Sequence, residues 1–302
     1  MQTIVGEEHW VTSRSAHDGS ALQLYLWEKR EEDDGDEAAD SGKVVLLVHG
    51  SRRSGRVAFD LPVKLAPDEF TYSFMDALAL AGYDVFSLDL QCYGRSDHHP
   101  AGLKVTTEVA AADIGAAVEY ICKLRNVARI DLVGWSWGAT TTAIYAERHA
   151  ARVRKLVLYG GRMTRLDPAD GGPLAVPIDT DYTENSRESS VQTLQPQLTE
   201  PKVLDSWLAE GDRWDARGPN GVVRDFQTRM PLSDPKKLTM PCLVVYGAED
   251  FQLRQSAAIA QYFANLATKD KTYAIIPDAG HAVHLHRTRE RFAKTLLGFL
   301  DA

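Results

Sequence analysis

Apolar and polar residues alternate along this chain in a pattern that predicts strands and helices in turn. The nearly continuous apolar run at residues 43–48 is expected for a strand buried on both faces of a parallel sheet. Further strand-like runs lie at residues 84–90, 130–133, 153–159, 242–246 and 272–276. Helices are predicted between and after them, at residues 70–81, 105–125, 138–149, 253–267 and 288–300. This α/β alternation predicts right-handed crossovers, and therefore a mainly parallel sheet with helices on both faces.

Two stretches near the amino terminus depart from this alternation. Residues 10–15 and 21–28 are short β-prone runs separated by a good hairpin turn, His17-Asp18-Gly19-Ser20, so we predict an antiparallel edge of the sheet. Residues 51–70 show no periodicity, which predicts a long loop directly after a buried strand. Long loops inside compact domains tend to be functional or mobile.

The pattern breaks again after residue 160, where the chain becomes rich in Pro, Gly, Asp and Thr. Only two helices are indicated there, at residues 189–198 and 201–210, and no buried strand. We therefore predict a cap or lid insertion that packs on one side of the sheet. The resulting division is a core in two parts, residues 1–160 and 238–302, with the cap insertion at residues 161–237.

The chain length and the distribution of charge exclude some classes of protein. A chain of 302 residues is long enough for one large core. Most of the formal net charge of -8 comes from seven acidic residues between positions 31 and 40, where no basic residue occurs. We interpret this segment as a solvated loop rather than a partner-binding surface. The sequence has neither a basic stripe nor an RNA-binding motif, which argues against a nucleic-acid partner.

Three features of the sequence indicate the cellular compartment of the protein. The amino-terminal residues lack the basic start and apolar run of a secretory signal, and no apolar stretch approaches the roughly 20 residues that a membrane-spanning helix needs. The three cysteines, Cys92, Cys122 and Cys242, are widely spaced and odd in number, which argues against a disulfide framework or a zinc site. We expect a cytoplasmic, reduced protein without a membrane partner.

The most informative stretch follows the strand predicted at residues 130–133. It reads Gly134-Trp135-Ser136-Trp137-Gly138 and leads into helix-compatible residues, which predicts a strand, a sharp turn and a helix with Ser136 at the apex. The two glycines allow the close backbone approach that such a turn requires. The free N–H groups at the start of the helix point toward the same space. The motif alone is also compatible with an ordinary strand-to-helix turn.

Further reactive residues follow other predicted strands, and the carboxyl ends of parallel strands share one edge of a sheet, where ligands bind. Together with the turn at Ser136, these features are His49-Gly50, Asp89 with Gly94-Arg95-Ser96, Asp250, and Gly280-His281. With this arrangement the chain resembles the α/β-hydrolase superfamily over nearly its whole length, in which a nucleophile, an acid and a base occur in that order. The resemblance implies a mainly parallel eight-stranded sheet flanked by helices, a helical cap insertion and a serine nucleophile of the esterase type.

The chemistry of acyl transfer assigns a role to each residue. The hydroxyl of Ser136 needs a base that accepts its proton, so His281 must lie within hydrogen-bond reach. A carboxylate on the other imidazole nitrogen fixes the tautomer, and Asp250 is the candidate. The negative charge that forms on the carbonyl oxygen is best met by two main-chain donors, the N–H groups of Ser51 and Trp137.

The position of the acid has alternatives. Asp250 is also placed to cap the following helix, in which case Glu249 would be the acid. In some members of the family the acid follows an earlier strand, but Gly160 and Gly161 occupy that place here, which favours Asp250.

A metal site is the alternative for the base. The spacing of His281, His284 and His286 suggests metal ligands, but no carboxylate or cysteine stands at ligand spacing. We interpret His284 and His286 as surface or packing residues and expect neither a metal nor another cofactor.

Two features beside the predicted site stay open. Arg52 and Arg53 could bind an anionic group of a substrate, although we favour arginines that face solvent. Cys92 stands where many members of the family carry the first glycine of the loop after Asp89, so this loop departs from the family pattern.

The leading functional hypothesis is a serine hydrolase that cleaves a carboxylic ester or a lactone of a small to medium, moderately hydrophobic substrate. Trp135, Trp207 and Trp214 are candidate substrate-binding residues. The same triad would serve a thioesterase, an amidase or a C–C bond hydrolase. A non-catalytic ligand-binding protein on this fold is the alternative from another class. The expected partner is a small-molecule substrate, and the sequence gives no indication of the oligomeric state.

Overall fold

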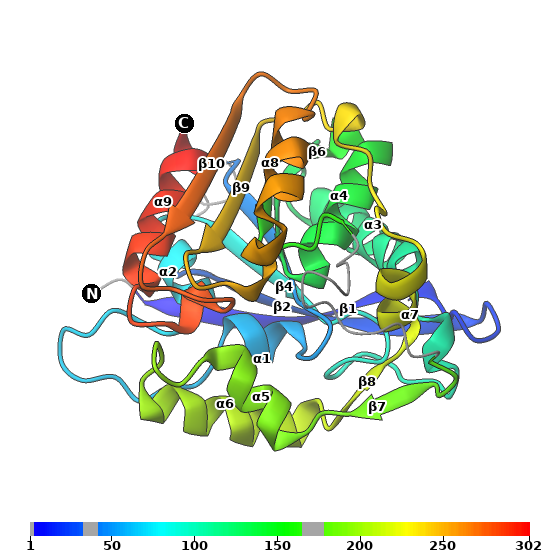
Figure 1. Ribbon diagram of the computed structural model, residues 1–302, viewed down its shortest axis with the longest axis horizontal. Coiled ribbons are helices and arrows are strands. Elements are labelled where there is room, and N and C mark those ends of the chain that lie inside the picture. The colour runs from blue at the N-terminus through cyan, green and yellow to red at the C-terminus, as the bar shows by residue number, and fades with distance from the viewer. Residues whose placement is uncertain (1–2, 33–41, 165–177) are drawn as a thin grey trace.

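The computed structural model describes residues 3–32, 42–164 and 178–302, and one eight-stranded sheet organises them (Figure 1). The strand order is β1-β2-β4-β3-β5-β6-β9-β10. The hairpin of β1 and β2 is antiparallel and joins the sheet antiparallel to β4, whereas all other neighbouring strands are parallel. The fold class and the antiparallel edge are therefore as predicted. The strands are β1 (Ile4–Arg14), β2 (Ala21–Glu31), β3 (Val44–Val48), β4 (Asp84–Leu88), β5 (Ile130–Trp135), β6 (Val153–Tyr159), β9 (Cys242–Gly247) and β10 (Lys271–Ile276).

Helices cover both faces of this sheet. The core on one face contains residues of α3, α4 and α8, and the core on the other face contains residues of α1, α2 and α9. Along β3 the buried side chains alternate between the two cores, which is why the strand reads as an unbroken apolar run. The helices are α1 (Gly55–Phe59), α2 (Phe74–Ala79), α3 (Thr107–Leu124), α4 (Trp137–Arg148), α8 (Ser256–Ala264) and α9 (Arg289–Asp301).

Helix α1 lies inside the segment that was predicted as a long loop. Five residues are too few to produce a helical periodicity in the sequence, and the helix depends on tertiary contacts. Its first residue, Gly55, donates its N–H to Asp89 Oδ1 at 2.7 Å. A Cβ on Gly55 would lie 2.4 Å from Ser87 Oγ, so this helix fits against β4 only because residue 55 is glycine.

Between β6 and β9 the chain leaves the sheet and forms the segment predicted as a cap, which we call the cap segment (residues 161–237). Helices α5 and α6 were predicted, whereas α7 and a separate antiparallel pair of short strands were not. In Figure 1, α5 and α6 lie next to each other, and α6 packs against α1. The described elements are β7 (Tyr182–Glu184), α5 (Arg187–Leu194), α6 (Pro201–Trp214), β8 (Arg217–Pro219) and α7 (Gly221–Thr228).

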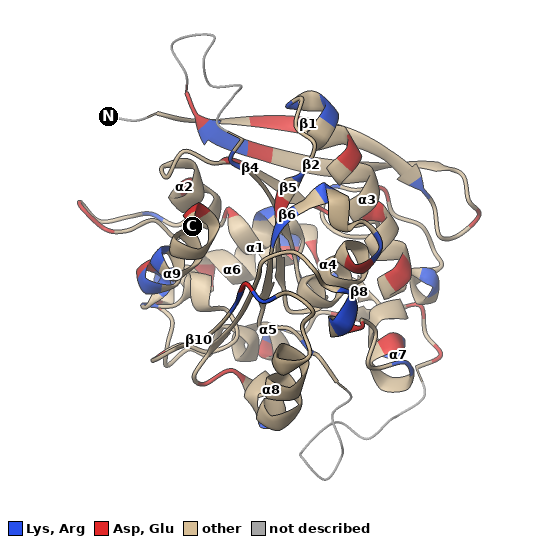
Figure 2. Ribbon diagram, turned by 90° about the horizontal axis from the view of Figure 1, so that it is seen from above, with Lys and Arg blue, Asp and Glu red and all other residues tan. Residues whose placement is uncertain are grey.

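Charged residues of both signs are distributed over the same elements, including the hairpin of β1 and β2 (Figure 2). The acidic segment singled out in the sequence falls mainly at positions 33–41, outside the described residues. Among the residues that the structure does describe, none of the helices is long and apolar enough to cross a membrane.

Candidate active site

Ser136 forms the sharp turn between β5 and α4, as the glycine pattern predicted. Its backbone has φ 58° and ψ -115°, a conformation that non-glycine residues rarely adopt. A Cβ on Gly134 would lie 2.2 Å from Gly138 O, and a Cβ on Gly138 would lie 2.1 Å from Val48 O. Both glycines are therefore required by the close packing of this turn against itself and against the end of β3.

The structure brings Ser136, His281 and Asp250 together, although they are far apart in the chain. Ser136 Oγ lies 2.9 Å from His281 Nε2. On the other side of the ring, His281 Nδ1 lies 3.0 Å from Asp250 Oδ2 and 3.1 Å from Oδ1. Asp250 and His281 are buried, whereas Ser136 is partly exposed. With its proton on Nδ1, the imidazole faces the carboxylate as a donor and the serine hydroxyl as an acceptor.

Asp250, and not Glu249, is the carboxylate that meets the imidazole. Asp250 Oδ1 also accepts the N–H of Gln252 at 2.9 Å and caps the short 3-10 turn Phe251–Gln255, so both roles considered for this residue are combined in one side chain. At the end of β6, a Cβ on Gly160 would lie 3.2 Å from Asp250 Oδ2. The space where an acid after β6 would stand is thus already used by Asp250.

The main chain of His281 is held by two buried aromatic residues at the ends of strands. Trp135 Nε1 donates to His281 O at 2.9 Å, and the hydroxyl oxygen of Tyr159 lies 3.0 Å from the same oxygen. Trp135 was predicted to bind substrate, but it is only 3% exposed and holds the main chain of His281 instead. The role of Tyr159 was missed, although its position at the carboxyl end of β6 is visible in the sequence.

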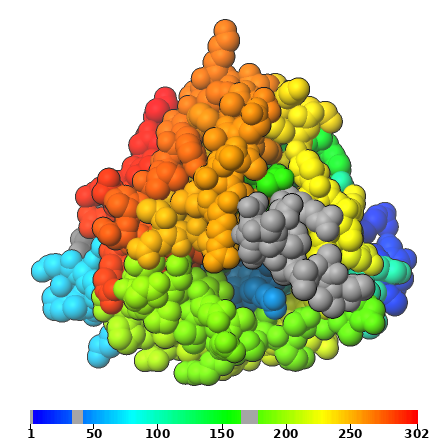
Figure 3. Space-filling model, viewed as in Figure 1, coloured from blue at the N-terminus to red at the C-terminus, as the bar shows by residue number. Residues whose placement is uncertain are grey.

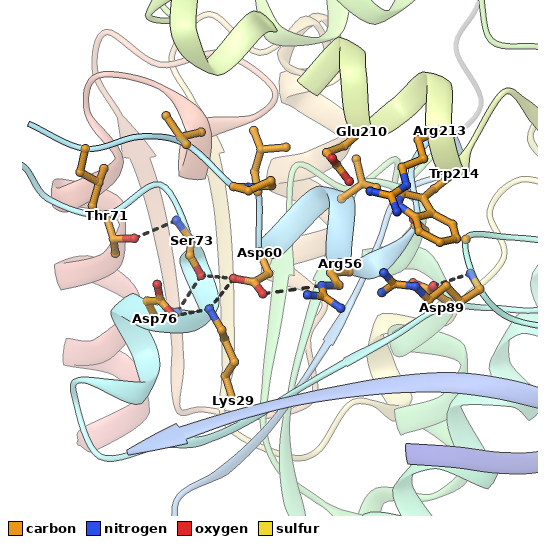
Figure 4. Close-up of a pocket in the computed structure, with 18 residues that line it drawn as sticks. Lys29, Arg56, Asp60, Thr71, Ser73, Asp76, Asp89, Glu210, Arg213 and Trp214 are labelled. Atoms are coloured by element: carbon orange, nitrogen blue, oxygen red, sulfur yellow. Dashed lines mark hydrogen bonds and ion pairs between the residues drawn. The ribbon is translucent and has the colours of Figure 1, made fainter. Parts of the chain in front are cut away.

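Trp207 and Trp214, which were also predicted to bind substrate, do not line a common cavity with Ser136, Asp250 and His281. Trp207 is 1% exposed and packs edge-on against Trp135, with ring centroids 6.3 Å apart. Trp214 lines a separate cavity of about 370 Å³ between α1, α2 and α6, and none of Ser136, Asp250 and His281 lines that cavity (Figure 4).

The turn after β3 is oriented by the ring of His49. Burial lowers the pKa of His49 to about 4, so the ring is neutral near pH 7. Its Nε2 accepts the N–H of Leu90 at 3.2 Å, and its Nδ1–H donates to Gly50 O at 2.6 Å. In a trans peptide the C=O and the following N–H point in opposite directions. The N–H of Ser51 therefore points away from the His49 ring.

This turn lies against Ser136, because a Cβ on Gly50 would be 3.2 Å from Ser136 Cβ. Within the described part of the chain, the N–H groups of Ser51 and Trp137 have no hydrogen-bond acceptor. Both groups are thus available to bind an oxyanion next to Ser136. Figure 3 shows a hollow between the cap helices and the segment after β9, in which the turn after β3 is visible in blue.

Of the two arginines after this turn, Arg52 is exposed, but Arg53 is not the solvent-facing residue that we favoured. Arg53 is 2% exposed and reaches into the cap segment, where Nη2 donates to Ser190 Oγ at 2.5 Å and Nη1 to Asp215 O at 3.4 Å. A Cβ on Gly211 would lie 2.6 Å from its guanidinium carbon. Burial lowers the pKa of Arg53. The residue joins the turn after β3 to α5 and α6.

His284 and His286 are buried packing residues. His284 lies between the hydroxyl of Tyr159, 3.1 Å from Nδ1, and Ala58 O, 3.0 Å from Nε2. His286 accepts the N–H of Gly280 on Nδ1 and donates from Nε2 to Leu194 O at 3.1 Å. Burial lowers the pKa of His284 to about 3 and that of His286 to about 4. All four ring nitrogens therefore have protein partners.

The loop after β4 shows how Cys92 takes the place of the glycine that many family members carry at this position. Cys92 is buried with φ 67°, in the left-handed region where glycine is favoured, and its N–H donates to Asp97 O at 3.0 Å. Asp89 fixes the neighbouring main chain by accepting the N–H groups of Gly55 and Arg95, and burial raises its pKa to about 7. The cysteine thus adopts the turn that a glycine would form more easily.

Comparisons with known proteins agree with this fold. Residues 45–295 match the model of the alpha/beta hydrolase family. The 2-hydroxy-6-oxononadienedioate/2-hydroxy-6-oxononatrienedioate hydrolase of Paraburkholderia phymatum is 25% identical over 255 residues, which are 76% of this chain and 80% of that protein.

Two solved structures illustrate the similarity. A thermophilic esterase from Thermogutta terrifontis superposes with a TM-score of 0.66 at 18% identity, covering 98% of each chain. A meta-cleavage product hydrolase from Pseudomonas fluorescens IP01 gives a TM-score of 0.61 at 18% identity, covering 96% of this chain and 97% of the other. At these identities the two structures support the fold alone. Because the family model spans most of the sequence, this chain belongs to the alpha/beta hydrolase family.

Proposed function

We propose that this hydrolase cleaves a carboxylic ester or a lactone of a small to medium, moderately hydrophobic substrate, with Ser136 as the nucleophile. The observation that carries the proposal is the chain of contacts from Ser136 Oγ to His281 Nε2 at 2.9 Å, and from His281 Nδ1 to Asp250 at 3.0 Å. A serine hydroxyl is a weak nucleophile unless a base accepts its proton, and this arrangement supplies that base.

In the proposed reaction, Ser136 Oγ attacks the ester carbonyl while its proton passes to His281 Nε2. Asp250 stabilises the imidazolium that forms. The tetrahedral oxyanion is bound by the N–H groups of Ser51 and Trp137. When it collapses, His281 returns the proton to the leaving alcohol. A water molecule then gives a proton to His281 and attacks the acyl-enzyme. His281 passes this proton to Ser136 Oγ as the bond to the acyl group breaks, which releases the carboxylic acid and restores Ser136.

An apolar group of the substrate has a surface to pack against beside the base. The ring of Phe251 lies 4.5 Å from the ring of His281, measured between centroids, and Phe251 is 41% exposed. An exposed aromatic side chain next to the reacting atoms favours substrates with a hydrophobic acyl or alcohol group.

The second candidate is a C–C bond hydrolase with the same triad. It is favoured by the relative from Paraburkholderia phymatum, whose name describes a hydroxy- and oxo-substituted dicarboxylate rather than an ester. In that reaction Ser136 and His281 would act on a ketone carbonyl, and the leaving group would be a carbon. A thioesterase and an amidase would also use these residues, so the substrate screen must include all of these bonds.

The test combines a covalent probe with a substrate screen. A fluorophosphonate should label Ser136 of the wild-type protein, and Ser136→Ala should remove labelling and lower kcat by about 10⁶ on any substrate found. Ser189→Ala, at a half-buried serine of α5, is the matched control and should be labelled like the wild type. Tight ligand binding without labelling or turnover would show that the protein is a binding protein and refute the proposal. Turnover of a ketone substrate in the absence of ester turnover would select the second candidate.

A further inference from the structure

One side chain of the cap segment bridges the two loops that carry the proposed acid and base. Gln195 Oε1 accepts the main-chain N–H of His281 at 2.8 Å. The amide nitrogen of the same side chain donates to the main-chain oxygen of Glu249, directly before Asp250, at 3.1 Å. A single amide group from the end of α5 therefore spans the loop after β9 and the loop after β10.

The backbone of Gln195 is in an unfavourable conformation. It caps the carboxyl end of α5 with φ 50° and ψ 84°, the left-handed region where glycine is the usual residue. A side chain at such a position costs free energy relative to glycine, so it is expected mainly where its own contacts compensate. The two hydrogen bonds of the amide group are such contacts.

The site that receives this amide exists because residue 280 is glycine. A Cβ on Gly280 would lie 1.5 Å from Gln195 Oε1 and 2.3 Å from the amide carbon. The three atoms nearest to that Cβ all belong to the end of the Gln195 side chain. An alanine at 280 would therefore displace the amide of Gln195 before it met any other group.

Neighbouring contacts fix the end of α5 against the same loop. His286 donates to Leu194 O at 3.1 Å and accepts the N–H of Gly280 at 3.0 Å. The N–H of Arg287 donates to Leu198 O at 3.1 Å. This part of the cap segment is thus hydrogen-bonded to the loop of His281 on both sides of Gln195.

We propose that Gln195 is a positioning residue that sets the separation of His281 and Asp250. The inference rests on the proposed function of the triad. Gln195 acts through the main chain of His281 and of Glu249 and makes no hydrogen bond to Ser136. Without the amide, the two loops keep the main-chain hydrogen bond from the N–H of Glu249 to Ala279 O at 2.8 Å, but the main chain of His281 loses its bond to the bridge. The imidazole then spends less time in line with both the carboxylate and the hydroxyl.

The predicted effect is on reactivity rather than on binding. Misplacing a catalytic group by about 1 Å can cost on the order of 10² in rate. We expect Gln195→Ala and Gly280→Ala each to lower kcat, and the rate of fluorophosphonate labelling of Ser136, by about 10-fold to 100-fold, with KM within about twofold of the wild type. Gln192→Ala, at an exposed glutamine of the same helix, should leave both rates unchanged.

The double variant Gln195→Ala/Gly280→Ala is the decisive measurement. Both substitutions remove the same contact, so the double variant should lose no more than the slower single variant. Losses that multiply in the double variant would overturn the proposal, as would single variants labelled at the wild-type rate. A fall in the unfolding midpoint with unchanged kcat would show a purely structural role and also overturn it. If the wild-type protein is not labelled at all, it is the proposed function that fails.

Discussion

The ring of His49 should be important for turnover, although it does not touch the reacting atoms. In His49→Ala the Gly50 carbonyl loses its donor, so the peptide that carries the N–H of Ser51 is free to rotate. Complete loss of an oxyanion donor costs about 10² to 10³ in kcat. Because the donor is released here rather than removed, we expect a loss of about 10², or about 2.7 kcal/mol of transition-state stabilisation. KM should change little, since the oxyanion exists only beyond the ground state.

The same substitution also has a cost in stability. Leu90 is buried, and its N–H would lose its acceptor, which costs about 1 to 3 kcal/mol. With the cavity left by the ring, we expect a loss of about 2 to 4 kcal/mol in the free energy of unfolding. Urea unfolding measures this loss, and steady-state kinetics on an ester that the screen identifies measures kcat and KM.

His9→Ala is the matched control for this experiment. His9 is also a buried histidine with two side-chain partners, Glu28 at 2.6 Å and Tyr120 at 3.0 Å, but it lies on β1, away from the triad. Its loss should lower stability without changing kcat of the folded protein. A folded His49→Ala enzyme with kcat within threefold of the wild type would refute the assigned role of the His49 ring.

Two further predictions concern stability. In Gly138→Ala the new Cβ would meet Val48 O at 2.1 Å and His49 O at 2.8 Å, so urea unfolding should show a loss of about 3 kcal/mol or more, and the fluorophosphonate should label Ser136 much more slowly. In the control Gly298→Ala nothing lies within 4 Å of the new Cβ, so this variant should be neutral or stabilising. Equal behaviour of the two variants would contradict the packing argument. Burial lowers the pKa of His284 to about 3, below its value of about 6.5 in the unfolded chain. As the pH falls, the unfolded state therefore takes up the proton first, and the contribution of His284 to stability is lost below about pH 6.5. The gap in unfolding free energy between the wild type and His284→Gln should therefore narrow by about 2 kcal/mol between pH 7 and pH 5, and a constant gap would contradict the lowered pKa.

The sheet could be predicted because each strand has a recognisable pattern of residues within its own stretch of sequence. Strands buried on both faces need apolar residues at every position, as in β3, and the turn at Ser136 needs glycine at positions 134 and 138. Both requirements leave a pattern within a short stretch of sequence, although the atoms that a Cβ on Gly138 would meet belong to the end of β3. The order of the strand ends then placed His281 and Asp250 near the nucleophile without any knowledge of the cap.

The parts that were not predicted depend on contacts between distant segments. Helix α1 is shorter than two turns and is held by Asp89, which lies on another loop. Trp135 was interpreted as a substrate contact beside Ser136, and Trp207 as one in the cap segment, but only the packing shows that both are buried. Gln195 is a polar residue in a segment of weak periodicity, and nothing next to it in the sequence indicates that its amide reaches two loops at once.

The neighbouring positions of β6 and β9 have a consequence for protein engineering. These strands pair directly, with Tyr159 opposite Val245, although the whole cap segment separates them in the chain. Exchanging that segment for one from another family member would therefore leave every strand pair of the main sheet intact. A chimera of this kind should retain its sheet, but its turnover would depend on whether the donor segment supplies a group that reaches the main chain of residues 249 and 281.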